Sequence, residues 1–137
     1  MKVLIDLGRG SGKWLRRSRT LGWAIKLLLE ASTQVNQLYI RSHPGLPLLY
    51  QSGVRYQNEP RGQGYEEFAP LATVYERGWG DCDDLAPIRC AELRERFGER
   101  ATIRVQWKKH PTGKLFHIVV RRGDGSIEDP SRILGMR

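Results

Sequence analysis

A helical pattern followed by three short β patterns in the C-terminal half limits what this chain can fold into. Apolar residues recur at helical spacing over residues 84–97, and Gly98 supplies the usual helix stop. Strand-like runs follow at 101–107, 114–121 and 127–129, separated by turn sequences rich in glycine, proline and aspartate. A helix followed by short strands predicts an α+β fold, with the helix packed on a small antiparallel sheet.

The N-terminal third predicts a long amphipathic helix. Apolar residues repeat at helical spacing from Leu21 to Val35, which places the helix between residue 18 or 20 and about residue 39. The segment 43–47, with two prolines and a glycine, ends it. A short helix is expected near residues 70–77.

Length and composition indicate one domain. The chain has 137 residues, 39% of them apolar, which allows a modest core. We expect a basic segment and long helix over 1–45 and the core over 46–137. No apolar run approaches the roughly 20 residues that span a membrane, and the start of the chain lacks a secretory signal, so we expect a cytoplasmic protein.

Basic residues are concentrated before and at the start of the long helix. The net charge is +8, and Arg16, Arg17 and Arg19 form the centre of the predicted patch. Such a patch attracts an acidic protein partner or a polyanion, although a solvated face is equally consistent with the composition. Specific nucleic-acid binding is the least favoured, because no recognition motif is present. The loop 8–13 has the wrong glycine spacing for a P-loop and is expected to be a connector after a short edge strand.

The segment 78–86 holds a single thiol between glycine and aspartate residues. Because Pro87 is tolerated only near a first helical turn, we place the helix N-cap at Asp83 or Asp84 and Cys82 on the preceding loop. The helix N-terminus favours the thiolate, whereas the aspartates oppose it. A glycine-flanked loop between charged residues is a poor core position, so Cys82 is interpreted as a nucleophile rather than a buried small residue.

A nucleophilic thiol needs a base and a group that orients the base, and His117 and Asp129 are the candidates. Each alone is typical of a structural role, as a core histidine or a turn acid. Together with Cys82 they make a Cys-His-Asp site. Asp124 is a competing orienting acid, which we discount because a Gly-Asp-Gly hairpin tip is usually exposed.

Strand register decides whether these two residues meet. If the hairpin pairs Arg122 with Ile127, then Val120 lies opposite Asp129. A small change of register or a bulge brings Asp129 diagonally opposite His117.

The cysteines and histidines give little support for a disulfide or a metal site. Cys82 and Cys90 lie about 12 Å apart along a helix, too far for a disulfide, and Cys90 is expected to be a buried core thiol. Zinc held by Cys82, His110 and His117 is disfavoured because no ligand pair has zinc-like spacing. We expect no metal and no cofactor.

The same residues resemble the transglutaminase-like branch of the papain-like cysteine enzymes. The resemblance covers about residues 46–136 and rests on the Gly-x-Cys-x-Asp-x-Ala helix entrance at 80–86, the strand histidine and the Asp-Pro pair after the next strand. It implies that Cys82 is the nucleophile, His117 the general base and Asp129 its orienting group. The best-known animal members carry Cys-Trp where this chain has Cys-Asp.

This resemblance implies a papain-like core and thiol-dependent acyl transfer at an amide of a protein or peptide. Transfer to water makes a protease or amidase and transfer to an amine makes a transglutaminase, and the sequence leaves both open. Trp79 is the candidate for a cleft wall or the oxyanion site. The segment 48–136 also resembles small tailed-phage proteins of this superfamily, whose domains are not all enzymes. The alternative is therefore a non-enzymatic structural or binding module, such as a virion component associated with phage structural proteins.

Overall fold

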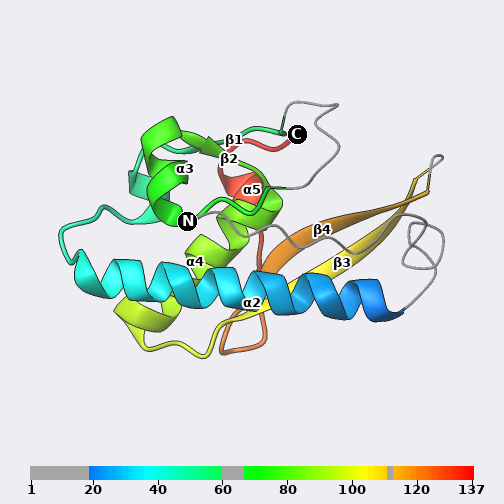
Figure 1. Cartoon of the computed structure of the whole chain (residues 1–137), viewed down its shortest axis with the longest axis horizontal. Helices are drawn as coiled ribbons and strands as arrows, with labels where there is room; N and C mark the ends of the chain where they lie inside the picture. The colour runs from blue at the N-terminus through cyan, green and yellow to red at the C-terminus, as the bar shows by residue number, and fades with distance from the viewer. Residues whose placement is uncertain (1–18, 60–66, 111–112) are drawn as a thin grey trace.

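The computed structural model describes residues 19–59, 67–110 and 113–137, shown as a ribbon in Figure 1. The first described element is α2, Arg19–Ser42, which confirms the predicted long helix and extends it by about one turn. It ends directly before His43 and the predicted breaker. The predicted edge strand and the loop 8–13 lie outside the described residues.

The middle of the chain forms short elements and one central helix. The 3-10 helix η1 spans Leu49–Gln51, and the two-residue strands β1, Arg55–Tyr56, and β2, Trp79–Gly80, pair in parallel. Between these strands, α3 spans Leu71–Arg77, which confirms the short helix predicted there. The central helix α4 spans Cys82–Phe97 and ends at Gly98 as predicted, with φ 61° in the left-handed region that favours glycine.

The C-terminal part forms the predicted antiparallel meander. Its strands are β3, Thr102–His110, β4, Gly113–Arg121, and β5, Ile127–Glu128, in the order β3-β4-β5, and the short helix α5, Pro130–Ile133, follows. The chain is thus a mixed fold of helices and a small antiparallel sheet.

The hairpin register differs by one residue from the simplest expectation. Arg121, not Arg122, lies opposite Ile127, and Val120 lies opposite Glu128. Arg122 instead donates its backbone N–H to the Ser126 carbonyl, 2.8 Å away within the turn. Because side chains alternate along a strand, this shift places Asp129 on the same sheet face as His117.

Helix α4 is the centre of the packing. In Figure 1, α2 lies across α4, and the β3–β4 hairpin extends toward the N-terminal end of α2. One core cluster joins α2, α4, β3 and β4, and a second joins α4 to α3, η1 and the segments around them. Since α4 contributes buried residues to both clusters, it is covered on two sides, and its first three turns are largely buried. Its N-terminus is thereby held in a fixed place.

None of the helices within the described ranges combines the length and the apolar composition needed to cross a bilayer.

Candidate active site

Cys82 is the first residue of α4. Asp81 occupies the N-cap position with extended backbone and makes no side-chain capping bond. The prediction that the helix starts after Cys82 is therefore wrong, and Pro87 lies in the second turn rather than the first. The thiol of Cys82 is half-buried and borders the core cluster that α4 shares with β3 and β4. At the first turn of a helix, backbone amides and the helix dipole favour a thiolate.

Asp84 is a tertiary anchor and not a helix cap as predicted. Its Oδ1 accepts the backbone N–H of Ala69 at 2.6 Å, and its Oδ2 accepts from Arg77 Nη2 at 2.5 Å. Burial and the charge of Asp81 raise the pKa of Asp84 to about 7, while Ala69 and Arg77 oppose the rise. A Cβ atom at Gly80 would lie 3.1 Å from the Asp84 Cβ, so glycine leaves room for this anchor.

Asp83 is buried without a hydrogen-bond donor among the described residues. Only 1% of the residue is exposed, and no N–H or O–H group of another described residue reaches its Oδ1 or Oδ2; Oδ1 of Asp81 is likewise buried without such a donor. Burial, a hydrogen bond shared with Asp81 and the neighbouring charges raise the pKa of Asp83 far above its usual value. A proton held by Asp83 and donated to Asp81 satisfies both carboxyls. This turn therefore carries less negative charge than its sequence suggests.

His117 and Asp129 are in hydrogen-bond contact. His117 Nε2 lies 2.8 Å from Asp129 Oδ2, and the two side chains are 11% and 20% exposed. The pair joins β4 to the residue that follows β5. Sequence reasoning thus chose two residues that the fold brings together, through the register shift described above.

Asp129 is fixed by a second role at the start of α5. It is the N-cap residue of this helix, and its Oδ1 accepts the backbone N–H of Arg132 at 3.2 Å. Arg132 Nε also lies 3.4 Å from Oδ2. One carboxylate therefore caps a helix with one oxygen and meets the histidine with the other.

This contact determines which histidine nitrogen can act as a base. A carboxylate only accepts hydrogen bonds, so the nitrogen facing Asp129 carries the proton. In the neutral ring Nδ1 of His117 then has the lone pair that can accept a proton. This is the arrangement required of a general base oriented by an acid.

Tyr56 is subject to the charges of both Cys82 and Asp129. Burial raises the pKa of the Tyr56 hydroxyl, and the charges of Cys82 and Asp129, among others, raise it further. In addition, the Tyr56 N–H donates to the Leu134 carbonyl at 2.9 Å, and Gln57 N–H donates to Gly80, so β1 joins the segments that hold the thiol and the acid.

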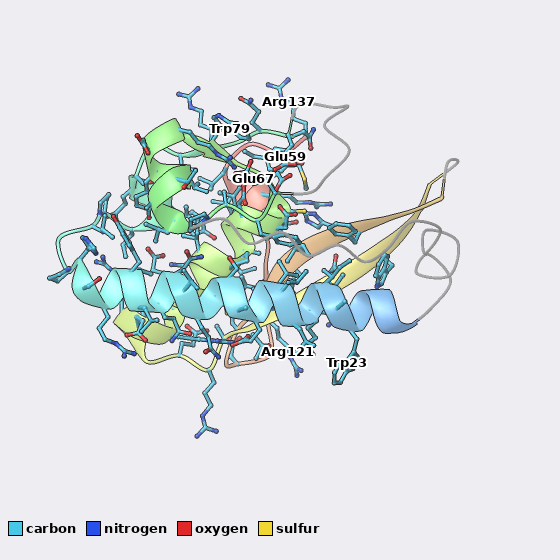
Figure 2. All side chains as sticks on the ribbon, viewed as in Figure 1. Trp23, Glu59, Glu67, Trp79, Arg121 and Arg137 are labelled. Atoms are coloured by element: carbon cyan, nitrogen blue, oxygen red, sulfur yellow. The ribbon has the colours of Figure 1, made fainter. Side chains whose placement is uncertain are left out.

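Two other predicted residues have clear places. Trp79 is half-buried on β2, with the Arg77 guanidinium 3.8 Å from the centre of its ring. In Figure 2, Trp79 is labelled in the upper part of the view, where Figure 1 places α3 and β2. Its role as cleft wall or oxyanion residue stays a prediction. Asp124 is exposed at the hairpin tip and binds Ser126, as expected for a turn acid.

The basic patch falls largely outside the described structure. Arg16 and Arg17 precede the first described residue, and Arg19 is described only as the start of the α2 backbone. The patch stays a prediction from sequence. Neither cysteine forms a disulfide, and Cys90 is fully buried as predicted, with a pKa raised by burial to about 12.

One close group of potential metal ligands exists among the described residues. It consists of Asp81, Asp83 and Asp84, with ligand atoms within 4.8 Å of one another. Asp84 is already bound by Ala69 and Arg77. The zinc set considered from sequence includes His110, whose side chain lies outside the described part.

Sequence reasoning missed three residues around the site: Tyr56, Arg89 and Glu128. The backbone of Tyr56 is paired with Gly80 and bonded to Leu134, which are far from it in sequence, and the charges of Cys82 and Asp129 act on its hydroxyl. Glu128 directly precedes Asp129 in the chain, and its Oε1 lies 2.6 Å from Arg89 Nε. The only sequence signal for Glu128 was its position directly before Asp129, the predicted site acid.

Comparison with known proteins gives no match: no family model, no curated protein and no solved structure is similar to this chain.

Proposed function

We propose that this protein is a thiol-dependent acyl transferase acting on an amide, on a papain-like, transglutaminase-like core. The observation that carries the proposal is the 2.8 Å contact between His117 Nε2 and Asp129 Oδ2. It lies in a fold where α4, which begins at Cys82, packs against β4 and α5. The order of thiol, histidine and acid in the chain agrees with the resemblance noted above.

The proposed reaction begins at the Cys82 sulfur. His117 Nδ1 accepts the thiol proton, and the thiolate attacks the substrate carbonyl to form a tetrahedral intermediate. The backbone amide of Cys82, at the positive end of α4, donates to the oxyanion. Collapse breaks the C–N bond, His117 returns the proton to the leaving amine, and a thioester remains on Cys82.

A second nucleophile then resolves the thioester. Water, deprotonated by His117, releases a carboxylic acid, whereas a primary amine forms a new amide. In both cases the thiol is regenerated, and Asp129 keeps the imidazole oriented through both half-reactions. The proposed substrate is a protein or peptide, as the resemblance noted above implies.

Product analysis distinguishes these outcomes. The protein is incubated with an unfolded, glutamine-rich protein substrate, with and without a fluorescent primary amine. Fluorescence incorporated into the substrate indicates amine transfer, and new peptide N-termini found by mass spectrometry indicate hydrolysis. We expect one of the two, with an acyl adduct on Cys82 when the reaction is quenched in acid. Absence of product and adduct across varied substrates would contradict the proposal.

A binding or structural module is the second candidate, favoured by one feature of α2. Trp23, Leu27 and Leu38 are more than half exposed on this helix. Figure 2 shows Trp23 projecting away from the body of the molecule. A large apolar face of this kind suits docking on another protein, for instance in a phage particle.

A further inference from the structure

The strand that directly precedes the site acid is too short to hold Asp129 in place alone. β5 has two residues, and it pairs with β4 only through Val120 and Arg121. A two-residue ladder leaves the chain free to twist, and a small twist would move Asp129 away from His117. The N-cap bond from Arg132 holds one oxygen of Asp129, and the position of β5 itself is set by a second group of contacts.

Glu128 makes these contacts from the opposite side of the strand. Its Oε1 accepts from Tyr50 Oη at 2.5 Å and from Arg89 Nε at 2.6 Å, and its Oε2 accepts from Arg122 Nη1 at 3.0 Å. The Glu128 and Arg89 side chains are each only 11% exposed. Burial would raise the pKa of Glu128, but the bonds from Arg89 and Tyr50 lower it below its usual value. The group is therefore a buried carboxylate in an ion pair.

Arg89 extends the connection into the middle of the molecule. Its Nη1 binds Glu92 Oε2 one turn further along α4, and Glu92 Oε1 accepts the backbone N–H of Leu49 at 2.8 Å. The Arg89 guanidinium also lies 4.7 Å from the centre of the Tyr50 ring. The same network thus fixes α4, η1 and β5 relative to one another, with little solvent to weaken it.

Arg89 and Cys82 share one rigid helix. They lie seven positions apart on α4, about two turns or 10 Å. Because Glu128 and Asp129 are neighbours with side chains on opposite sides of the chain, fixing Glu128 to α4 fixes where Asp129 points.

We propose that Arg89 and Glu128 are positioning residues of the thiol site, which hold Asp129 against His117 at a fixed place relative to Cys82. This inference rests on the function proposed above. Neither residue touches the substrate. Loss of the pair lets Asp129 move, which weakens its support of the imidazolium and raises the pH at which Cys82 becomes reactive.

The test measures the pH dependence of Cys82 alkylation by iodoacetamide in Glu128→Gln and Arg89→Gln, with melting temperatures measured in parallel. We expect alkylation near pH 6 to slow about tenfold, which corresponds to a shift of one pH unit in the profile. Arg89→Lys keeps the charge and should restore part of the rate. If a glutamine variant does not fold, the alkylation profile of Arg89→Lys is compared with the wild type instead.

Arg94→Gln is the matched control. Arg94 lies on the same helix and binds Glu30 of α2 at 2.6 Å, but it has no contact with β5 in the described network. We expect it to lower the melting temperature without moving the alkylation profile. If the Arg89 and Glu128 variants also lose stability but keep the wild-type profile, their role is only structural and the inference is wrong. A wild-type profile unaffected by His117→Ala would instead overturn the proposed function, and the positioning role with it.

Discussion

Replacing Cys82 by serine should reduce amide cleavage or amine transfer by several orders of magnitude. Serine keeps nearly the same size and still donates a hydrogen bond, but its hydroxyl ionises far less readily than a thiol. His117 and Asp129 should keep their 2.8 Å contact, because it is made between β4 and the residue that follows β5. The first measurement is product formation per enzyme molecule with the glutamine-rich protein and the fluorescent amine described above. The second is complementation, in which the variant replaces the wild-type protein in its own organism or particle.

Cys90→Ala provides the control for this variant. Cys90 is fully buried on α4, so its removal should cost stability through a small cavity and leave the reaction per folded molecule unchanged. If Cys82→Ser complements fully and the wild-type protein forms no adduct, the molecule is a binding module. Loss of product in Cys90→Ala at full folding would indicate that the wrong thiol has been assigned.

Asp83→Asn should stabilise the protein by up to roughly 4 kcal/mol at pH 7, because folding then no longer requires this carboxyl to take up a proton, at about 1.4 kcal/mol for each pH unit above the usual aspartate pKa of about 4. Asp83 is buried with no donor for either oxygen among the described residues, and burial raises its pKa far above the usual value. The fold therefore keeps this carboxyl protonated, while the unfolded chain ionises it above about pH 4. Asparagine donates to Asp81 as the protonated acid does, and it has no proton to lose.

The pH dependence of stability follows from the same shift. Between about pH 5 and 7 the folded state holds protons at Asp83 and, up to its pKa of about 7, at Asp84, whereas the unfolded state does not. The free energy of unfolding should fall as pH rises, by about 1.4 kcal/mol per pH unit for each proton. Asp83→Asn should remove one of these contributions, as measured by denaturant unfolding at several pH values.

Asp124→Asn is the comparison for this experiment. Asp124 is exposed and Ser126 lowers its pKa, so it is ionised in both states above about pH 5 and should leave the slope unchanged. An Asp83→Asn protein that is less stable at pH 7, with the wild-type slope, would show that Asp83 is ionised in the fold.

Local patterns were enough to predict most of the elements. Helical spacing predicted α2 and α4, and the turn sequences separated β3, β4 and β5, because each signal comes from neighbouring residues. The N-terminus of α4 was misplaced for a different reason. Asp83 and Asp84 look like helix caps, but contacts made on folding bury them, and for Asp84 these come from Ala69 and Arg77.

In the candidate site, too, local sequence signals predicted some features, whereas others depend on contacts formed on folding. His117 and Asp129 could be chosen from strand alternation and a turn, but whether they met depended on one residue of register, which turns every side chain of a strand to the other face. The ties to Arg89 and Tyr56 join residues far apart in sequence, and they follow only from the packing of α4, β1 and β5. No local pattern contains that information.

The most direct test of the central claim is the rate at which iodoacetamide labels Cys82 as a function of pH, in the wild-type protein and in His117→Ala. Mass spectrometry reads each thiol separately, and Cys90, with a pKa raised by burial to about 12, is the internal reference. If His117 activates Cys82, labelling of Cys82 should be rapid well below pH 8.5, the usual thiol pKa, and His117→Ala should slow it at least about tenfold near pH 6. Equal, slow labelling of both thiols, or a Cys82 profile that His117→Ala leaves unchanged, would contradict the account.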